Sequence, residues 1–384
     1  MKVALIITNL ATGGAETMLL KLLTHLDRAR FQPTVISLVG MGEIGPRIAA
    51  LGVPVHALGM RRGGMPDPLA LLRLARLLRR LRPDVVHTWI YHADLLGGVA
   101  SRLAGYDRVV WCLRNSDLDP QRSGRMTLRV VKACAWLSGR VPAKIVSCST
   151  RAKKVHAAAG YRDDKIHVIP NGFELDRFQP DAAARASVRA ELGLADGASL
   201  VGLVARYDPQ KNHAGFVQAA AQVVAGRPDA HFVLAGAGVD AANGALQATI
   251  AAQGLQQRMH LLGRRDDVPR LMAAFDVLAS SSSYGEAFPN VLGEAMACAV
   301  PCVVTDVGDS AEIVGDTGRV VPPGDMDGLA RELLAVLQLP VAERAALGGR
   351  ARARVAAHYE IGHVTRLYEA FYEQVLAAGR PRGV

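Results

Sequence analysis

The stretch VALIITNLATGGAETMLLKLLTH, residues 3–25, decides the fold class. An apolar run typical of a buried strand leads into a glycine-rich loop, and leucines at helical spacing follow. Helical segments then separate further short apolar runs, at 33–39, 54–58, 84–89 and 144–149. Continuous apolar runs of this kind, without strict alternation, are typical of parallel strands buried on both faces.

The same alternation restarts after residue 195, with apolar runs at 199–206, 231–238, 259–263, 275–283 and 301–308. Two strand–helix series predict an α/β protein of two doubly wound, Rossmann-like domains that face each other across a cleft. Residues 169–199 lie between the series and begin with Ile-Pro-Asn-Gly, which is typical of a hinge. We therefore predict a first domain over 1–178 and a second over 179–363.

Composition narrows the class of protein. Of the 384 residues 50% are hydrophobic and 21% are charged, which excludes a disordered chain, and no apolar run reaches the length of a membrane span. Gly13, Gly14 and Glu16 stand where a signal peptide would be cleaved, so we expect a cytoplasmic protein. The five cysteines form no CxxC pair, which predicts reduced core thiols and no structural zinc.

Positive charge is concentrated in the first half of the chain. Residues 1–180 hold 27 Lys and Arg against 13 Asp and Glu, a net charge of +14, whereas the whole chain carries +10. The remainder is therefore mildly acidic. We expect the basic half to meet an anionic partner.

The segment SSSYGEAFPNVLGEAMACAVPCVVTDVG, residues 281–308, is the strongest candidate for a binding site. Pro289 suits the first helical position, so the amides near Asn290 and Val291 would form an anion site for a diphosphate. Glu286 precedes this helix and Glu294 lies in its second turn. Eight helical residues span about 12 Å, too far for the carboxylate pair of a glycosidase, which indicates separate roles along an elongated ligand. A capped helix with a surface glutamate is the alternative.

Two cations follow the strand predicted at 199–206. Arg206 ends this strand, and Lys211 follows across an Asp-Pro turn. Beside a helix N-terminus, the two side chains would neutralise a departing diphosphate. A pair of solvated loop charges is the alternative.

The loop at 9–14 could bring its backbone close to a ligand, because Gly13 and Gly14 carry no side chains. Its spacing matches neither the GxGxxG motif nor the P-loop. No acidic residue follows about 20 positions later to hold a ribose, which argues against a nicotinamide dinucleotide. A plain tight turn is the alternative.

Polar and aromatic side chains follow two predicted strands of the first domain. A histidine or an aromatic ring at this edge could contact a sugar, although a single histidine such as His87 or His92 is more often packed or capping. The candidates are Trp89, Tyr91, His92, Arg114 and Asn115.

Two predicted helices, 69–82 and 125–140, are apolar on one side and rich in arginine on the other. Such helices can lie on an anionic membrane surface, although an arginine-faced helix packed on a sheet is equally compatible with the pattern. Nucleic acid is not favoured as a partner, because aromatic residues make up only 5% and no known nucleic-acid motif occurs.

Together these residues resemble the retaining glycosyltransferases of family four, which have the GT-B fold of two Rossmann-like domains. The resemblance covers nearly the whole chain. It is carried by GGAE at 13–16, IPNG at 169–172, R-x4-K from Arg206 to Lys211, and E-x7-E from Glu286 to Glu294. Each motif alone is unspecific, and only their combination identifies the family.

The resemblance implies a role for each matching residue. The Gly13–Gly14 loop would approach the donor phosphates, and Arg206 and Lys211 would bind the diphosphate. Glu286 would contact the transferred sugar and Glu294 the nucleotide ribose. The other donor contacts implied are Arg264 and the backbone of Phe288, Pro289, Asn290 and Val291. A C-terminal helix at about 364–384 would pack back on the first domain.

One departure from the family concerns the first domain. Many members carry His-x-His after the fourth strand, and their second histidine faces the reacting sugar. This chain has His87-Thr88-Trp89, so either His92 takes over part of that role or the sugar is bound differently. The family's EGFG is EAFP here, which keeps the helix start but fixes it with Pro289.

We therefore expect a hexosyl-type, retaining glycosyltransferase that needs neither a metal ion nor a cofactor. A nucleotide diphospho-sugar, most simply UDP-linked, would bind the second domain, with Glu286, His92, Arg206 and Lys211 as catalytic residues. The first domain would bind a glycan or lipid-linked acceptor of bacterial-type surface polysaccharide or lipopolysaccharide synthesis, at the inner face of the plasma membrane. The alternatives are a nucleotide-sugar 2-epimerase-like enzyme or a phosphorylase of the same fold, and a non-catalytic subunit that binds nucleotide sugar.

Overall fold

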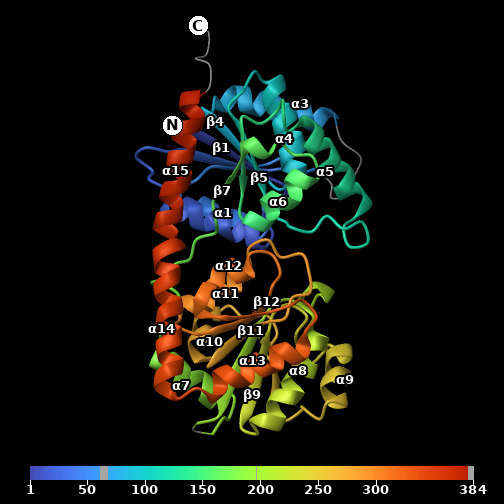
Figure 1. The fold of residues 1–384 in the computed structure, drawn as a ribbon. Helices are drawn as coiled ribbons and strands as arrows, with labels where there is room; N and C mark the ends of the chain where they lie inside the picture. Colours follow the sequence, from blue (N-terminus) through green and yellow to red (C-terminus); the bar gives the residue numbers. More distant parts are fainter. Residues whose placement is uncertain (61–67, 196, 379–384) are drawn as a thin grey trace. The chain divides into compact units, whose positions relative to one another are not determined.

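The computed structural model describes residues 1–60, 68–195 and 197–378 (Figure 1). The described chain forms two compact units. Unit 1 comprises Met1–Gly172 and the chain from Ile361 onward, and unit 2 comprises Phe173–Glu360. The chain thus changes unit at Gly172 and again at Glu360, a few residues before the boundaries expected at 178 and 363.

Unit 1 is built on a parallel sheet of seven strands in the order β3-β2-β1-β4-β5-β6-β7. Ala4, Leu5 and Ile6 of the interior strand β1 are at most 1% exposed, because helices cover both faces of the sheet. The strands are β1 (Lys2–Ile7), β2 (Gln32–Ser37), β3 (Val55–Ala57), β4 (Val85–Trp89), β5 (Val109–Leu113), β6 (Lys144–Ser147) and β7 (Ile166–Val168).

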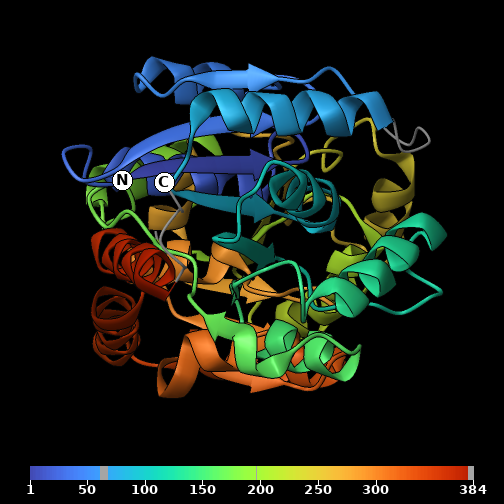
Figure 2. The same cartoon turned by 90° about the horizontal axis from the view of Figure 1, so that it is seen from above.

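Alternate residues of β1 point to opposite faces of this sheet. Leu5 shares an apolar cluster with α1, α2 and α15, whereas Ile6 shares one with α3 and α4, and α5 packs in a third cluster (Figures 1 and 2). The helices of unit 1 are α1 (Gly14–His25), α2 (Ile44–Ala50), α3 (Pro68–Leu81), α4 (Tyr91–Leu103), α5 (Arg125–Leu137), α6 (Thr150–Ala158) and α15 (Ile361–Ala378).

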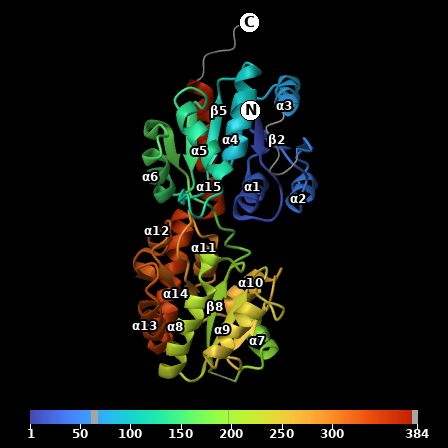
Figure 3. The same cartoon turned by 90° about the vertical axis from the view of Figure 1, so that its right-hand side faces the viewer.

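Unit 2 repeats the plan with a parallel sheet of six strands, ordered β10-β9-β8-β11-β12-β13. Figure 3 shows this unit turned by 90° from the view of Figure 1. The strands are β8 (Ser199–Val204), β9 (Ala230–Ala235), β10 (Met259–Leu261), β11 (Val277–Ser280), β12 (Cys302–Thr305) and β13 (Arg319–Val321). The helices are α7 (Ala182–Glu191), α8 (His213–Gly226), α9 (Gly244–Ala252), α10 (Val268–Ala274), α11 (Asn290–Ala297), α12 (Ser310–Val314), α13 (Met326–Gln338) and α14 (Val341–His358).

The two doubly wound sheets confirm the predicted α/β fold of two Rossmann-like domains. Two edge strands of three residues each, β7 and β13, escaped the sequence pattern. A strand at a sheet edge buries few apolar residues, so its run is short and its hydrophobic signal weak.

Packing explains the glycine of the Ile-Pro-Asn-Gly motif. A Cβ atom on Gly172 would lie 2.9 Å from the Cα atom of Ile361, the first residue of α15. Immediately beyond, within unit 2, Phe173 N donates to Tyr359 O at 2.8 Å. The outgoing and returning segments of the chain therefore run side by side, and only glycine fits between them.

A buried carboxylate joins helices of unit 2 to its sheet. Asp276 precedes β11 and is 7% exposed, and its Oδ2 accepts a hydrogen bond from Leu200 N at 2.8 Å. Arg185 of α7 donates to Oδ1 at 2.8 Å, and Arg344 of α14 lies 3.5 Å from the same oxygen. Arg189 approaches Oδ2 at 3.6 Å. One carboxylate is therefore the ion-pair partner of three arginines from two helices.

We expect Asp276→Asn to lower the free energy of unfolding by about 3 kcal/mol, because the substitution leaves three partly buried arginines without their charged partner. Urea denaturation measures the change. Asp229→Asn is the matched control, since the Asp229 side chain is 44% exposed and pairs with Arg227 at the surface. That variant should lose less than about 1 kcal/mol, and equal losses in the two variants would contradict the prediction.

Candidate functional site

A tight turn holds Lys211 at the carboxyl edge of the unit 2 sheet. The turn Pro209–Lys211 follows β8 and is capped by Asp208, whose Oδ1 accepts a hydrogen bond from Gln210 N at 3.0 Å. Asn212 then adopts a left-handed backbone conformation, with φ of 53°, and its Oδ1 accepts a hydrogen bond from Gly215 N to cap α8. Two side-chain caps thus fix the point at which Lys211 leaves the backbone.

Lys211 and Glu286 form an ion pair, in which the ammonium contacts Glu286 Oε1. Ser282 Oγ donates to the same carboxylate oxygen at 2.9 Å, and Ser281 Oγ donates to Lys211 O at 2.8 Å. The side chains of Lys211 and Glu286 are only 17% and 11% exposed. The structure therefore brings these two predicted residues together and locks the loop after β8 to the loop after β11.

The loop that carries Glu286 packs against Gly308, which follows β12. Gly308 has φ of 63°, and a Cβ atom there would lie 2.3 Å from Glu286 O. The next residue, Asp309, donates its amide to Ala287 O at 3.0 Å. Gly308 therefore has to be glycine for two reasons, its backbone conformation and the close approach of the Glu286 loop.

The helix after Glu286 starts one residue later than expected. Pro289 has an extended ψ of 106° and is the N-cap, so α11 begins at Asn290. Leu292 N donates to Pro289 O at 3.2 Å, which leaves Asn290 and Val291 as the residues whose amides stand at the helix N-terminus. The amides predicted to bind an anion thus stand at the start of α11, and Glu294 lies half-buried in the second turn.

The Phe288 side chain is buried, so this residue can offer a ligand only its backbone. Its side chain is 8% exposed and its ring centroid lies 6.2 Å from that of Phe173 and 5.5 Å from that of Tyr359. These contacts turn the ring into the core. The main chain at Phe288 and Pro289 is therefore what the loop can offer to a ligand.

Two further cations lie on the same edge of unit 2. Arg206 is 58% exposed and is tethered to the Lys211 turn, with Nε 3.1 Å from Asp208 Oδ2 and Nη2 3.4 Å from Gln210 Oε1. Arg264 is exposed and follows Gly263, whose φ is 62° and whose carbonyl accepts from Gly236 N at 2.8 Å. Cations beside a helix N-terminus can stabilise a diphosphate.

In unit 1, Gly13 is the N-cap of α1 and has an extended backbone that any residue could adopt. Its lack of a side chain is explained by Glu16, because a Cβ atom on Gly13 would lie 2.4 Å from Glu16 Oε2. Thr12 Oγ1 also donates to Glu43 in the loop after β2. The absence of a side chain at Gly13 therefore lets the Glu16 carboxylate fold back over the start of α1.

The residue that follows strand β4, Ile90, has a strained backbone conformation. Ile90 has φ of 74°, a conformation that β-branched residues rarely adopt, and it directly precedes α4. Such outliers cost about 1–3 kcal/mol and cluster at functional sites. The next turn carries His92, which is half-buried, and burial lowers the pKa of its imidazole. His92 therefore stays mostly neutral at pH 7.

Two residues predicted on this edge turn inward. Trp89 is 0% exposed and Tyr91 4%, and the Tyr91 hydroxyl lies 2.8 Å from His156 Nε2. Neither ring offers a surface to an acceptor, which corrects the prediction for both. The cause is the parallel sheet, because β4 is covered on both faces and the first residue of α4 packs toward α5.

Arg114 and Asn115 follow β5. Asn115 closes a local turn, with Oδ1 accepting from Asp117 N at 3.1 Å and Nδ2 donating to Asp117 O at 3.0 Å. Arg114 is half-buried, and its guanidinium lies over the Trp89 ring, 4.1 Å from the ring centroid. Of the residues predicted on this edge, the structure thus leaves His92, Arg114 and Asn115 partly exposed.

A protonated carboxyl, that of Asp94 on α4, joins the carboxyl ends of β4 and β5. Asp94 is fully buried, and its Oδ1 accepts hydrogen bonds from Thr88 Oγ1 at 2.5 Å and from Cys112 N at 3.2 Å. Oδ2 finds no hydrogen-bond partner among the described residues. Burial raises the pKa of Asp94 to about 8, so the carboxyl is mostly protonated at pH 7.

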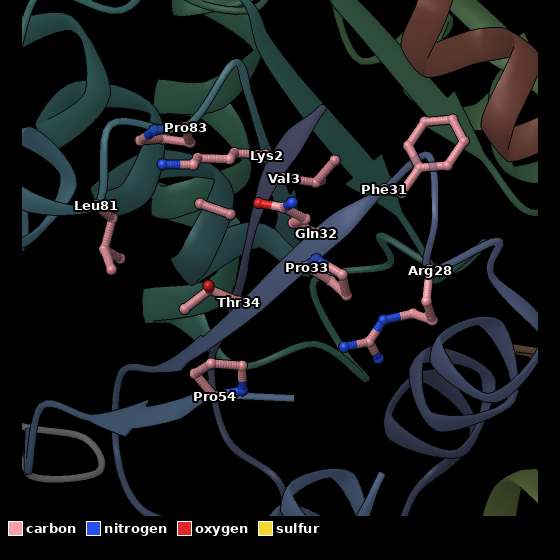
Figure 4. Close-up of a pocket in the computed structure, with 11 residues that line it drawn as sticks. Lys2, Val3, Arg28, Phe31, Gln32, Pro33, Thr34, Pro54, Leu81 and Pro83 are labelled. Atoms are coloured by element: carbon pink, nitrogen blue, oxygen red, sulfur yellow. The ribbon is translucent and has the colours of Figure 1, made fainter. Parts of the chain in front are cut away.

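Two hollows of unit 1 lie at the amino-terminal edge of its sheet. One of about 370 Å³ lies beside the starts of β1 and β2, between Lys2, Arg28 and Pro54 (Figure 4). Another of about 440 Å³ is lined by cations that include Arg102 and Lys144. Neither contains a predicted site residue. Within 1–60, 68–195 and 197–378, no group of three or more His, Cys, Asp or Glu could hold a metal ion.

Two family models match the chain in succession. The model described as Glycosyltransferase Family 4 matches residues 12–177, and the model described as Glycosyl transferases group 1 matches residues 198–339. The chain is a family 4 glycosyltransferase. The predicted family, the GT-B fold and the predicted enzyme class are thereby confirmed.

Curated relatives and a solved structure agree with this assignment. The glycosyltransferase is 29% identical over 276 residues to UDP-Gal:alpha-D-GlcNAc-diphosphoundecaprenol alpha-1,3-galactosyltransferase from Escherichia coli, with 70% of each chain covered. It is 27% identical to a lipopolysaccharide core biosynthesis mannosyltransferase from Rhizobium meliloti, covering 89% of this chain and 93% of the relative. The fold matches that of Anabaena HepE, solved with UDP, at a TM-score of 0.85 and 24% identity, covering 97% and 100% of the two chains.

Sequence reasoning missed three residues that shape the carboxyl edges of the two sheets, Ser282 in unit 2 and Ile90 and Asp94 in unit 1. Ser282 lies in a run of four serines, and nothing in that run indicates which hydroxyl binds Glu286. The strain at Ile90 leaves no sequence signal, because the residue is an ordinary strand former. Asp94 could have been noticed as a lone acidic residue in the apolar stretch that follows His92.

We expect the protonated Asp94 to make stability depend on pH. The folded chain holds this proton up to about pH 8, whereas a free carboxyl releases it near 3.8, so folding takes up a proton between these values. The stability is therefore present at low pH and falls as the pH rises from about 4 to 8. Asp94→Asn should be more stable than the original chain by about 5 kcal/mol at pH 8, since each unit of pKa difference corresponds to about 1.4 kcal/mol, and the difference should vanish near pH 4.

Thermal unfolding followed across this pH range measures the effect. Asp316→Asn removes one exposed carboxylate instead and should leave the pH profile unchanged. A constant difference between the Asp94→Asn variant and the original chain at all pH values would contradict the assignment.

Proposed function

We propose that the chain transfers a hexosyl group from a nucleotide diphospho-sugar to an acceptor, with retention of configuration and without a metal ion. The observation that carries this is the Lys211–Glu286 ion pair in the loops that lead into α11. A cation, a carboxylate and helix amides are the groups that a diphosphate and a sugar require. The UDP-sugar in the name of the E. coli relative supports UDP as the nucleotide.

The ion pair gives the mechanism its first step. On donor binding, Lys211 transfers its contact from Glu286 to the diphosphate, where Arg206 and the amides at Asn290 and Val291 add positive charge. These groups stabilise the charge that develops on the departing phosphate. Glu286, released from Lys211, accepts a hydrogen bond from a hydroxyl of the transferred sugar, and Glu294 accepts one from the ribose.

The acceptor oxygen then attacks the anomeric carbon on the face from which the nucleotide leaves. The bond between that carbon and the phosphate oxygen breaks, and the departing phosphate takes the proton of the acceptor hydroxyl. In this proposal the Gly13–Gly14 loop approaches the donor phosphates, and Arg264 lies beside the base. His92, which burial keeps neutral, is positioned by the strained Ile90 to accept a hydrogen bond from the sugar.

We propose that unit 1 supplies the acceptor side and that the acceptor is a lipid-linked glycan of surface polysaccharide or lipopolysaccharide synthesis. The name of the E. coli relative supports this, because the acceptor in that name is a sugar on diphosphoundecaprenol. The lipopolysaccharide role named for the R. meliloti relative points the same way. The positive charge of residues 1–180 suits an anionic acceptor.

Two helices of unit 1 support contact with the inner face of a membrane. α5 exposes a stripe of cations that ends in Trp136, which is 71% exposed, and α3 exposes arginines beside Leu69, which is 68% exposed. Neither helix contains an acidic residue. The exposed cations are Arg73, Arg76, Arg79 and Arg80 on α3 and Arg125, Arg129 and Lys132 on α5. In the described segments, no helix combines the length and apolar character that crossing a bilayer requires.

Donor turnover tests the proposed chemistry. Nucleotide release is followed for UDP-, GDP- and ADP-sugars with a membrane lipid extract as the source of acceptor. Glu286→Gln keeps the size of the side chain but weakens its hydrogen bonds, and Lys211→Met removes the cation. Each should slow acceptor-dependent release at least 100-fold, or about 2.7 kcal/mol.

Lys154→Met removes an exposed lysine from α6 and should leave the rate of release unchanged. Sugar isomerisation without an acceptor would overturn transfer in favour of the 2-epimerase-like alternative. Nucleotide-sugar binding without any turnover would identify a non-catalytic subunit, the alternative that Trp89 in place of the family's second histidine leaves open.

Sedimentation with lipid vesicles tests the membrane contact. The triple variant Arg125→Glu, Arg129→Glu and Lys132→Glu should bind vesicles of phosphatidylcholine and phosphatidylglycerol at least tenfold more weakly, since each surface cation contributes about 1 kcal/mol. Reversing Arg177, Arg331 and Arg350 in unit 2 makes the same change in net charge, and those side chains are exposed. Equal binding by the two triple variants would rule out α5 as the contact.

A further inference from the structure

Trp89, the residue that departs from the family pattern, is the platform of a fixed cation. The guanidinium carbon of Arg114 lies 4.1 Å from the centroid of the Trp89 ring, which is 0% exposed. Arg114 Nε donates to the thiol sulfur of Cys112, two residues earlier on β5, at 3.1 Å. Stacking on one face and a bond from Nε set the plane of the guanidinium.

The other two guanidinium nitrogens are fixed as well. Arg114 Nη1 donates to Asn171 Oδ1, from the segment after β7, and Nη2 donates to the hydroxyl of Tyr368 on α15 at 2.8 Å. Asn171 is 5% exposed and Tyr368 is fully buried, so both partners are rigid. Each Nη atom carries two N–H groups, and each of these two hydrogen bonds uses one of them, so one N–H group on each Nη atom is left for a ligand.

The contacts of Arg114 neutralise none of its charge. Within the described parts of the chain no carboxylate forms an ion pair with Arg114, and its hydrogen-bond partners are a thiol, an amide oxygen and a phenol. The buried Asp94 interacts with it electrostatically, but burial raises the pKa of that carboxyl to about 8. A half-buried, pre-oriented guanidinium of this kind suits an anion that binds it through two oxygens.

A helix terminus lies at the same edge. Leu113 pairs with Ser147 across β5 and β6, and Cys148 N donates to Leu113 O at 3.2 Å, directly beside Arg114. Ser149 then caps α6, accepting from Ala152 N at 2.8 Å. The positive end of the α6 dipole and the Arg114 charge therefore both favour an anion here.

We propose that Arg114 determines specificity for the acceptor by binding a phosphate group of the acceptor, with Trp89 as its platform. The inference rests on the proposed function for the assignment of unit 1 to the acceptor. This proposal accounts for the tryptophan at the position of the family's second histidine. The indole ring of Trp89 is larger than an imidazole ring and therefore offers the Arg114 guanidinium a larger flat surface on which to stack. An acceptor with a diphosphate linkage presents the matching oxygens.

Binding of methylenediphosphonate to the full-length protein tests this, with UDP saturating the donor site. The probe is followed by its phosphorus NMR signal. Arg114→Gln should weaken its binding at least tenfold, and Arg114→Lys, which keeps the charge but loses the fork, by a smaller factor. Tyr368→Phe removes only the Nη2 partner and should weaken binding about threefold. Thermal unfolding of each variant identifies any that fails to fold.

Arg122→Gln is the matched control, because Arg122 lies in the same loop and its side chain is 44% exposed. Unchanged binding in the Arg114→Gln variant, or equal losses in the Arg114 and Arg122 variants, would overturn the proposal. Farnesyl diphosphate serves as a second probe. If farnesyl diphosphate binds more tightly than the diphosphonate, the phosphate belongs to a lipid-linked acceptor. If the two probes bind equally, it belongs to a soluble phosphorylated acceptor. In both cases Arg114→Gln should weaken the binding.

The two proposals fail separately. If UDP does not bind, the proposed donor chemistry is wrong, and the diphosphonate titration is repeated without UDP in the Arg206→Gln, Lys211→Gln double variant. That background removes the cations of unit 2, so any remaining binding that depends on Arg114 belongs to unit 1. No remaining binding overturns the Arg114 site.

Discussion

The parallel direction of all strands in each sheet is the constraint on which the rest of the structure depends. It carries every carboxyl end to one edge, so loops that are distant in sequence meet there. Lys211 and Glu286 are 75 positions apart, and they form an ion pair because β8 and β11 are hydrogen-bonded neighbours. The same constraint brings Arg114 beside the start of α6, because β5 and β6 are paired.

The fold and the donor edge of unit 2 could be predicted because they leave local signals. Apolar runs mark buried strands, and Pro289 marks a helix start to within one residue. Lys211 and Glu286 were recognisable because their motifs flank strand ends, where parallel sheets collect polar groups. The edge strands β7 and β13 left too few apolar residues to be seen.

The edge of unit 1 could not be predicted in the same way, because its side chains are oriented by tertiary packing. Trp89 and Tyr91 have the character of ligand contacts, yet the layers above and below β4 enclose both. The positive φ at Ile90 and the protonation of Asp94 likewise depend on neighbours that the local sequence does not reveal. Arg114 was recognisable as a polar residue at a strand end, but its fixed orientation depends on Asn171 and Tyr368, far along the chain.

The return of α15 to unit 1 has a consequence for the order of folding on the ribosome. Tyr368 and Tyr372 close the core over Phe31 and His87, and they belong to the last helix that the structure describes. Domains generally complete their folding as they emerge, the N-terminal one first. Here that order is reversed, since all of unit 2 is synthesised before the helix that completes unit 1. The nascent first unit therefore carries an open apolar face throughout the synthesis of the second, and transiently exposed apolar surface of this kind is prone to aggregation.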